Sequence, residues 1–125
     1  HIVASVQTTD GETTTQTDAY STTMLAEDKW YHVAASFEPG VAVRVYVNGV
    51  LEDSVACTDT ATVELSNGSY LGRWGGGGHP DANMQDVWLY REPHDTGWFT
   101  AEYQNYCSPT FYEVGSEEDG VSWIS

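Results

Sequence analysis

The sequence of 125 residues has little positive charge, with four Lys and Arg residues against 19 Asp and Glu residues and a formal net charge of −15. This imbalance repels the phosphates of nucleic acids, so we expect no DNA or RNA partner. No apolar run reaches the roughly 20 residues that a membrane-spanning helix needs, and we expect no membrane insertion. The length predicts one domain with a single core.

Sequence motifs of several enzyme classes are also missing. There is no G-x-S-x-G nucleophile motif and no H-E-x-x-H metal motif. The four consecutive glycines at 75–78 lack the Lys-Ser/Thr pair that a phosphate-binding loop requires, so they indicate a flexible loop. We therefore expect a protein that is not an enzyme.

Only two cysteines are present, Cys57 and Cys107, and they form no C-x-x-C pair, which argues against a zinc site. In an exported protein we expect them to form a disulfide. Closing this loop of about 50 residues would stabilise the fold by roughly 4 kcal/mol. Two free thiols are the alternative.

The regular structure is predicted to consist of short strands separated by turns. Apolar and polar residues alternate in several segments, and β-branched residues fill others, as half-buried strands require. Asp10-Gly11 and Asn48-Gly49 are hairpin turn signals. A single short helix, capped by Asp95 or Thr96, is predicted at 95–106. The predicted extended segments are 1–7, 13–23, 29–37, 41–47, 50–55, 61–65, 70–74, 84–90 and 110–114.

Four motifs occur in an order that resembles the laminin-G-like jelly roll of the concanavalin A-like lectin/glucanase type. They are KWYHVA at 29–34, VYVNG at 45–49, YLGR at 70–73 and MQDVWLY at 84–90, and the segment 98–118 resembles the end of such modules in exported proteins. The resemblance implies an all-β, antiparallel two-sheet sandwich with one short C-terminal helix.

The sequence departs from this family in two respects. Gln85 and Trp88 stand where relatives have an aspartate and a basic residue. Fewer strands than is usual in the family precede the KWYHVA motif at 29–34. We therefore expect a sandwich over residues 1–118 that is incomplete on its N-terminal side, or is completed or covered by a neighbouring chain, and a tail or linker over 119–125.

The resemblance also implies a function. It favours a recognition or adhesion module of a larger protein, located outside the cell, on the cell surface or on a virion, that binds a glycan or a protein surface. The alternative is a structural decoration or assembly domain of a surface filament, stalk or virion. A glycoside hydrolase is disfavoured, since the E-x-D-x-x-E spacing of related hydrolases is absent.

Sugar sites combine aromatic rings with hydrogen-bonding groups, and this combination selects the candidate ligand residues. Val87 and Leu89 are expected in the core, with Trp88 on the opposite face, exposed to a ligand or packed on a neighbouring sheet. Trp30 and Trp98 are expected to be core or helix-packing residues. The predicted ligand-binding residues are Trp74, His79, Asp86, Trp88 and Tyr90.

Many laminin-G-like modules hold calcium at the rim of the sandwich, which the resemblance makes a prediction here. Calcium takes six to eight oxygen ligands, usually from several loops. Asp81 and Asn83 lie in one loop and are the candidate ligands. No other cofactor is expected.

Overall fold

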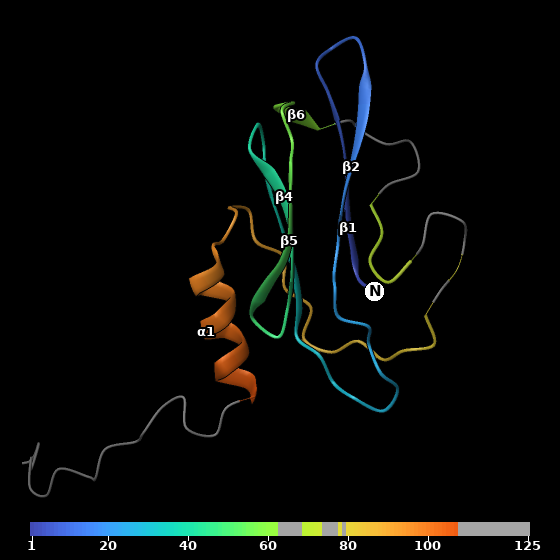
Figure 1. Ribbon diagram of the computed structural model, residues 1–125, viewed down its shortest axis with the longest axis vertical. Helices are drawn as coiled ribbons and strands as arrows, with labels where there is room; N and C mark the ends of the chain where they lie inside the picture. Colours follow the sequence, from blue (N-terminus) through green and yellow to red (C-terminus); the bar gives the residue numbers. More distant parts are fainter. Residues whose placement is uncertain (63–68, 74–77, 79, 108–125) are drawn as a thin grey trace, which may run out of the picture.

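The structure is a computed structural model that describes residues 1–62, 69–73, 78 and 80–107. Two three-stranded antiparallel sheets lie face to face, and a helix covers the outer side of one of them (Figure 1). The first sheet has the order β2-β1-β6 and the second β3-β4-β5. The elements are β1 Val3–Thr9, β2 Thr14–Tyr20, β3 Val33–Glu38, β4 Ala42–Val47, β5 Val50–Ala56, β6 Ala61–Thr62 and α1 Thr96–Cys107. The predicted all-β fold with one short C-terminal helix is confirmed.

The turn between β1 and β2 is made by the predicted Asp10-Gly11 pair. The Asp10 carboxylate accepts hydrogen bonds from the backbone amides of Glu12 and Thr13 at 2.9 and 2.7 Å. Gly11 has a φ of 100°, which glycine adopts with little strain. The amides of Thr13 and Glu12 lower the pKa of Asp10, because they stabilise its ionised form.

The turn between β4 and β5 matches the predicted type I′ hairpin. Asn48 and Gly49 have φ values of 51° and 76°, and this turn type needs a positive φ at both positions. The Asn48 side chain accepts a hydrogen bond from the backbone N–H of His32 at 3.1 Å, and the Asn48 N–H donates to the His32 carbonyl at 2.7 Å. The turn therefore also fixes the chain just before β3.

The core between the two sheets is built from alternate residues of β4. Val43 and Val45 are buried there, against Ala4 and Ala19 of the first sheet. The predicted alternation of residues 41–47 is confirmed, since Tyr46 points to the opposite face, where it meets the helix. Partly buried side chains extend this core: Ile2, Val6, Phe37 and Val55.

The helix lies on the outer face of the β3-β4-β5 sheet (Figure 1). Tyr46 is only 1% exposed, and its ring centroid lies 4.5 Å from that of the buried Phe99. Thr100 Oγ1 donates to the Gly49 carbonyl at 2.7 Å. The predicted cap is confirmed, because Asp95 Oδ1 accepts from the N–H of Trp98 at 2.9 Å.

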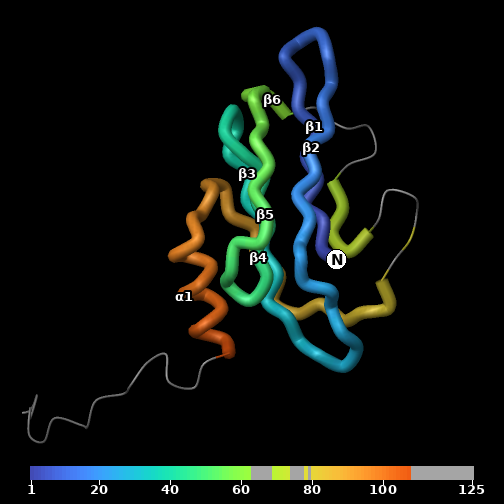
Figure 2. The backbone as a smooth tube through the Cα atoms, viewed as in Figure 1, coloured from blue at the N-terminus to red at the C-terminus, as the bar shows by residue number. Residues whose placement is uncertain are grey.

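Two predicted strands are wrong within the described residues. Residues 69–73 contain no strand, and 84–90 run as an irregular connection between the side of β1 and β2 and the start of α1 (Figure 2). Val87 and Leu89, predicted for the core, are 62% and 97% exposed. A strand needs a partner to satisfy its backbone, and the described chain places none beside 84–90.

Further corrections concern Trp30 and the cysteines. Trp30 was expected to be a core or helix-packing residue but is 71% exposed, because β3 begins only at Val33. The predicted disulfide is absent: Cys57 is free and buried between the sheets, and Cys107 is free and exposed at the end of α1. The predicted strand at 110–114 and parts of those at 61–65 and 70–74 lie outside the described residues.

Candidate functional site

A shallow groove of about 430 Å³ lies between α1 and the end of the connection that precedes it. Residues three and four apart share one face of a helix, and α1 lines the groove with such a set. The adjacent face of the helix, with Phe99, packs on the sheet. The residues that line the groove are Trp88, Tyr90, Trp98, Ala101, Glu102, Asn105 and Tyr106.

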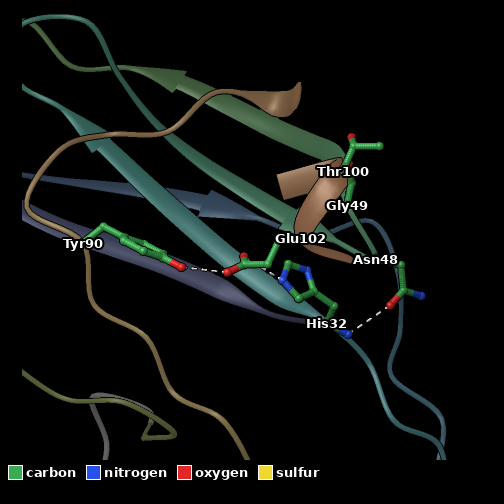
Figure 3. Close-up of polar contacts among 6 residues, drawn as sticks. All are labelled: His32, Asn48, Gly49, Tyr90, Thr100 and Glu102. Carbon is green, nitrogen blue, oxygen red and sulfur yellow. Dashed lines mark hydrogen bonds and ion pairs between the residues drawn. The ribbon is translucent and has the colours of Figure 1, made fainter. Parts of the chain in front are cut away.

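Glu102 is held in place by two hydrogen bonds (Figure 3). Tyr90 donates its hydroxyl to one carboxylate oxygen at 2.8 Å, and the other oxygen lies 3.0 Å from His32 Nε2. The side chains of His32 and Glu102 are largely buried. The contact with His32 is an ion pair when the imidazole is protonated. This network joins the connection, the helix and the start of the β3-β4-β5 sheet.

The carboxylate also changes the chemistry of Tyr90. The Glu102 carboxylate accepts a hydrogen bond from the Tyr90 hydroxyl, and this bond raises the pKa of Tyr90. On ionisation, the phenolate would lose the bond and would face the like charge of the carboxylate. Partial burial acts in the same direction. Tyr90 therefore remains a donor to Glu102 across the neutral pH range.

Stacked rings fix the aromatic wall of the groove. The imidazole of His94 stacks on Trp98 with 4.1 Å between ring centroids and 11° between planes. Tyr90 meets His94 edge-on at 4.6 Å and Trp98 edge-on at 5.9 Å. Edge-to-face and offset arrangements of this kind are favourable for aromatic pairs. The wall is therefore set by contacts within the protein.

The groove presents aromatic surface to solvent. Four rings line it, and all four are exposed, with Trp88 at 61%. Glu102 and Asn105 add one carboxylate and one amide. Rings can stack on the apolar C–H faces of sugars or on other flat ligands, while the carboxylate and amide can form hydrogen bonds with hydroxyl groups. The arrangement can bind such a ligand by contact alone.

The predicted ligand residues are only partly brought together. Trp88 and Tyr90 line the groove. Asp86 does not; it is exposed, has a φ of 53° and accepts a hydrogen bond from Gln85 at 3.2 Å. Trp74 and His79 lie outside the described residues.

The residues that α1 contributes to the groove were not predicted as ligand residues. A signal existed in the sequence, because Trp98 and Glu102 are four residues apart and so share a helix face with Asn105. That face could have been assigned to solvent or to the sheet, and only the docking of Phe99 against Tyr46 decides which.

The calcium prediction stays a prediction. Asp81 and Asn83 are both exposed. Across the part of the chain that the structure describes, no three His, Cys, Asp or Glu side chains are grouped closely enough to hold a metal ion. Carbonyl and amide oxygens, which calcium also uses, can complete a site without such a group.

Comparison with models of known protein families gives a match. A laminin-G family model, described as the concanavalin A-like lectin/glucanases superfamily, matches residues 3–95. No curated protein and no solved structure matches the chain. Within the described residues, no helix is both long and apolar enough to cross a membrane. The match spans most of the chain and includes both sheets, so this protein belongs to the concanavalin A-like lectin/glucanase superfamily.

Proposed function

We propose that the chain is a non-catalytic recognition module that binds a glycan in the groove beside α1. The observation that carries the proposal is the set of four exposed aromatic rings around one carboxylate and one amide. Membership of a superfamily of lectins and glucanases supports carbohydrate as the ligand. We also propose that the module acts as part of a larger protein outside the cell or on a cell or virion surface.

The single carboxylate supports binding without bond cleavage. Glycoside hydrolases use two carboxyl groups, on the order of 5–10 Å apart, on either side of the scissile bond. Glu102 is the one carboxylate among the described residues that line the groove. A second acid opposite it would be needed for the usual hydrolytic mechanism.

The test compares two tryptophans that are both exposed. Trp88 lines the groove, whereas Trp30 is 71% exposed and lies outside it. Binding of wild type, Trp88→Ala and Trp30→Ala is measured on a glycan array and then by calorimetry with the glycans retained. We expect Trp88→Ala to weaken binding about tenfold, which corresponds to the loss of about 1.4 kcal/mol of stacking. Trp30→Ala should bind like the wild type.

Two results would contradict this proposal. One is the absence of binding to any glycan on the array. The other is an equal loss in two tryptophan variants that both remain folded, which would place the ligand elsewhere. Circular dichroism of each variant checks that it is folded, because an unfolded variant loses its β-sheet signal.

A second candidate function is structural assembly with neighbouring chains. Met84, Val87 and Leu89 are all exposed in the connection before α1, and exposed apolar residues close together mark contact surfaces. Each sheet in the described chain also has free edge strands that could pair with another chain. Analytical ultracentrifugation tests this role: a stable oligomer that dissociates on Leu89→Asp would favour assembly.

A further inference from the structure

We infer that the groove prefers a positively charged sugar, such as a glucosamine polymer with free or alkylated amines, over neutral and acidic glycans. This inference rests on the proposed glycan-binding function and names its ligand class. It depends on three features of the described groove: its aromatic rings, the absence of basic side chains from its lining, and the orientation of Glu102.

The aromatic rings provide the first attraction. The face of an aromatic ring carries partial negative charge and attracts ammonium groups, most strongly when the ring is an indole. Two of the four rings in the groove are the indoles of Trp88 and Trp98. His94 covers part of the Trp98 ring by stacking. Trp88 is 61% exposed and is stacked by no other ring among the described residues, so it is the indole more accessible to a cation.

The distribution of charge provides the second attraction for a positively charged sugar. None of the four Lys and Arg residues lines the groove, while the whole chain carries a net charge of −15. Arg44 pairs with Glu38 at 3.0 Å, and Arg73 lies over the Tyr70 ring at 4.3 Å. A negative protein field concentrates cations and repels sulfated or uronic-acid polymers. An acidic glycan would therefore meet repulsion with no basic partner in the groove.

The carboxylate of Glu102 provides the third attraction. Each of its oxygens receives one hydrogen bond, from Tyr90 or from His32. A carboxylate has about four acceptor positions, so it can still accept from a hydroxyl group of a ligand, and its charge attracts an ammonium group whether or not that group carries an N–H. The two existing bonds restrain its orientation at the groove. A fixed acceptor beside aromatic faces matches a sugar that carries an amine.

The experiment compares two oligosaccharides of equal length. One is an N-trimethylated glucosamine oligosaccharide, whose charge does not vary with pH, and the other is its neutral N-acetylated counterpart. Calorimetric titration of the whole chain should give at least about tenfold tighter binding of the charged probe. This preference should shrink as sodium chloride is raised, because salt screens exposed charges.

Glu102→Gln separates the groove from general attraction by the acidic surface. This change removes the charge while keeping an oxygen that can accept from Tyr90. The matched control is Glu27→Gln, since Glu27 is exposed in the loop between β2 and β3. We expect Glu102→Gln to reduce the preference for the charged probe several-fold and Glu27→Gln to leave it intact.

The possible failures are distinguishable. Equal binding of the two probes would overturn this inference and leave glycan binding standing. A preference that both glutamine variants reduce equally would also overturn it, since the attraction would come from net charge alone. If neither probe bound and the glycan array were also negative, the proposed function itself would fail.

Discussion

Two segments of this protein share the same alternating pattern but differ in structure. The predicted strand at 41–47 forms β4 (Ala42–Val47), in which Val45 is completely buried between the sheets. Residues 84–90 alternate in the same way, yet Val87 and Leu89 are exposed and no strand forms. Alternation alone therefore does not determine whether a segment joins a sheet.

The difference lies in the neighbours that the chain supplies. β4 is joined by short turns to β3 before it and to β5 after it, so partners on both sides are close in sequence. The connection at 84–90 has no such hairpin on either side within the described residues, and its nearest regular element is α1. Pairing with a distant strand requires loop closure, whose entropy opposes it, and the one such pair in the described chain, β1 with β6, joins only two residues of each strand. The contrast shows that an adjoining hairpin turn, and not the hydrophobic pattern alone, distinguishes β4 from 84–90.

The largest effect is expected at Gly49, where α1 rests on the β4–β5 turn. An added Cβ would lie 2.9 Å from Thr100 Cα and 3.0 Å from Tyr103 Cβ, in a residue with a φ of 76°. Gly49→Ala should lower the free energy of unfolding by about 3 kcal/mol, through backbone strain together with crowding. Urea denaturation measures this loss.

Gly11→Ala is the control for Gly49→Ala. Gly11 also has a positive φ, but no atom lies within 4 Å of the position that an added Cβ would take. It should therefore lose only the strain contribution, about 1–2 kcal/mol. Equal losses in the two variants would mean that α1 does not rest on the turn, and the groove that depends on this docking would be lost.

The next prediction tests the two alternating segments directly with one chemical change. Val45→Ala removes two buried methyl groups and should lower the free energy of unfolding by about 2 kcal/mol. Val87→Ala changes a side chain that is 62% exposed and should cost less than about 0.5 kcal/mol. Urea denaturation of both variants gives the comparison. A similar loss in both would show that 84–90 is buried in solution, in a sheet or against another chain.

These contrasts show how far the sequence predicts the fold. The turns at Asp10-Gly11 and Asn48-Gly49 and the cap at Asp95 were predicted correctly, because each depends on residues within a few positions of one another. The strand at 84–90 and the burial of Trp30 were predicted wrongly, because each depends on packing partners far along the chain. Local chemistry was therefore sufficient to predict the turns and the cap, and it was not sufficient to predict which segments pair or which side chains are buried.

The candidate site was half predictable for the same reason. Trp88 and Tyr90 were selected by their chemistry, as aromatic residues in a segment with polar neighbours. Glu102 and Trp98 become site residues only because Phe99 packs on Tyr46 and thereby turns the other helix face towards the connection. No local pattern contains that information.

A smaller effect is expected at Tyr90, which ties the connection to α1. Tyr90→Phe removes the hydroxyl that donates to Glu102 at 2.8 Å and should lower the free energy of unfolding by less than Val45→Ala does, because a single hydrogen bond contributes less than buried methyl groups. The raised pKa of Tyr90 means that the neutral phenol stabilises the fold, and this contribution is present below the ordinary pKa of 10.0 and is lost as the pH rises above it. Urea denaturation on either side of that pH should show a smaller alkaline loss in Tyr90→Phe. An unchanged alkaline loss would mean that the connection is not held by this bond.

The smallest effect is expected at Glu52, which lies in β5 and so belongs to the paired strands rather than to the connection at 84–90. The hydroxyl and then the backbone amide of Thr23 donate to its carboxylate, and these bonds lower its pKa below the ordinary value of 4.5. A lowered pKa in the folded state stabilises the protein above that value, and the contribution is lost as the pH falls through the folded pKa. Thermal unfolding at neutral and acid pH should therefore show a weaker acid loss in Glu52→Gln than in the wild type, while the exposed Glu27→Gln controls for the removal of one charge. Some acid sensitivity should remain through Asp10, whose pKa is also lowered. If Glu52→Gln and Glu27→Gln shift the acid profile equally, the Thr23 bonds do not stabilise the contact between β5 and the segment that follows β2, and the hydrogen bond from the Tyr20 N–H to Asp53 at 2.9 Å remains as the polar link between these strands.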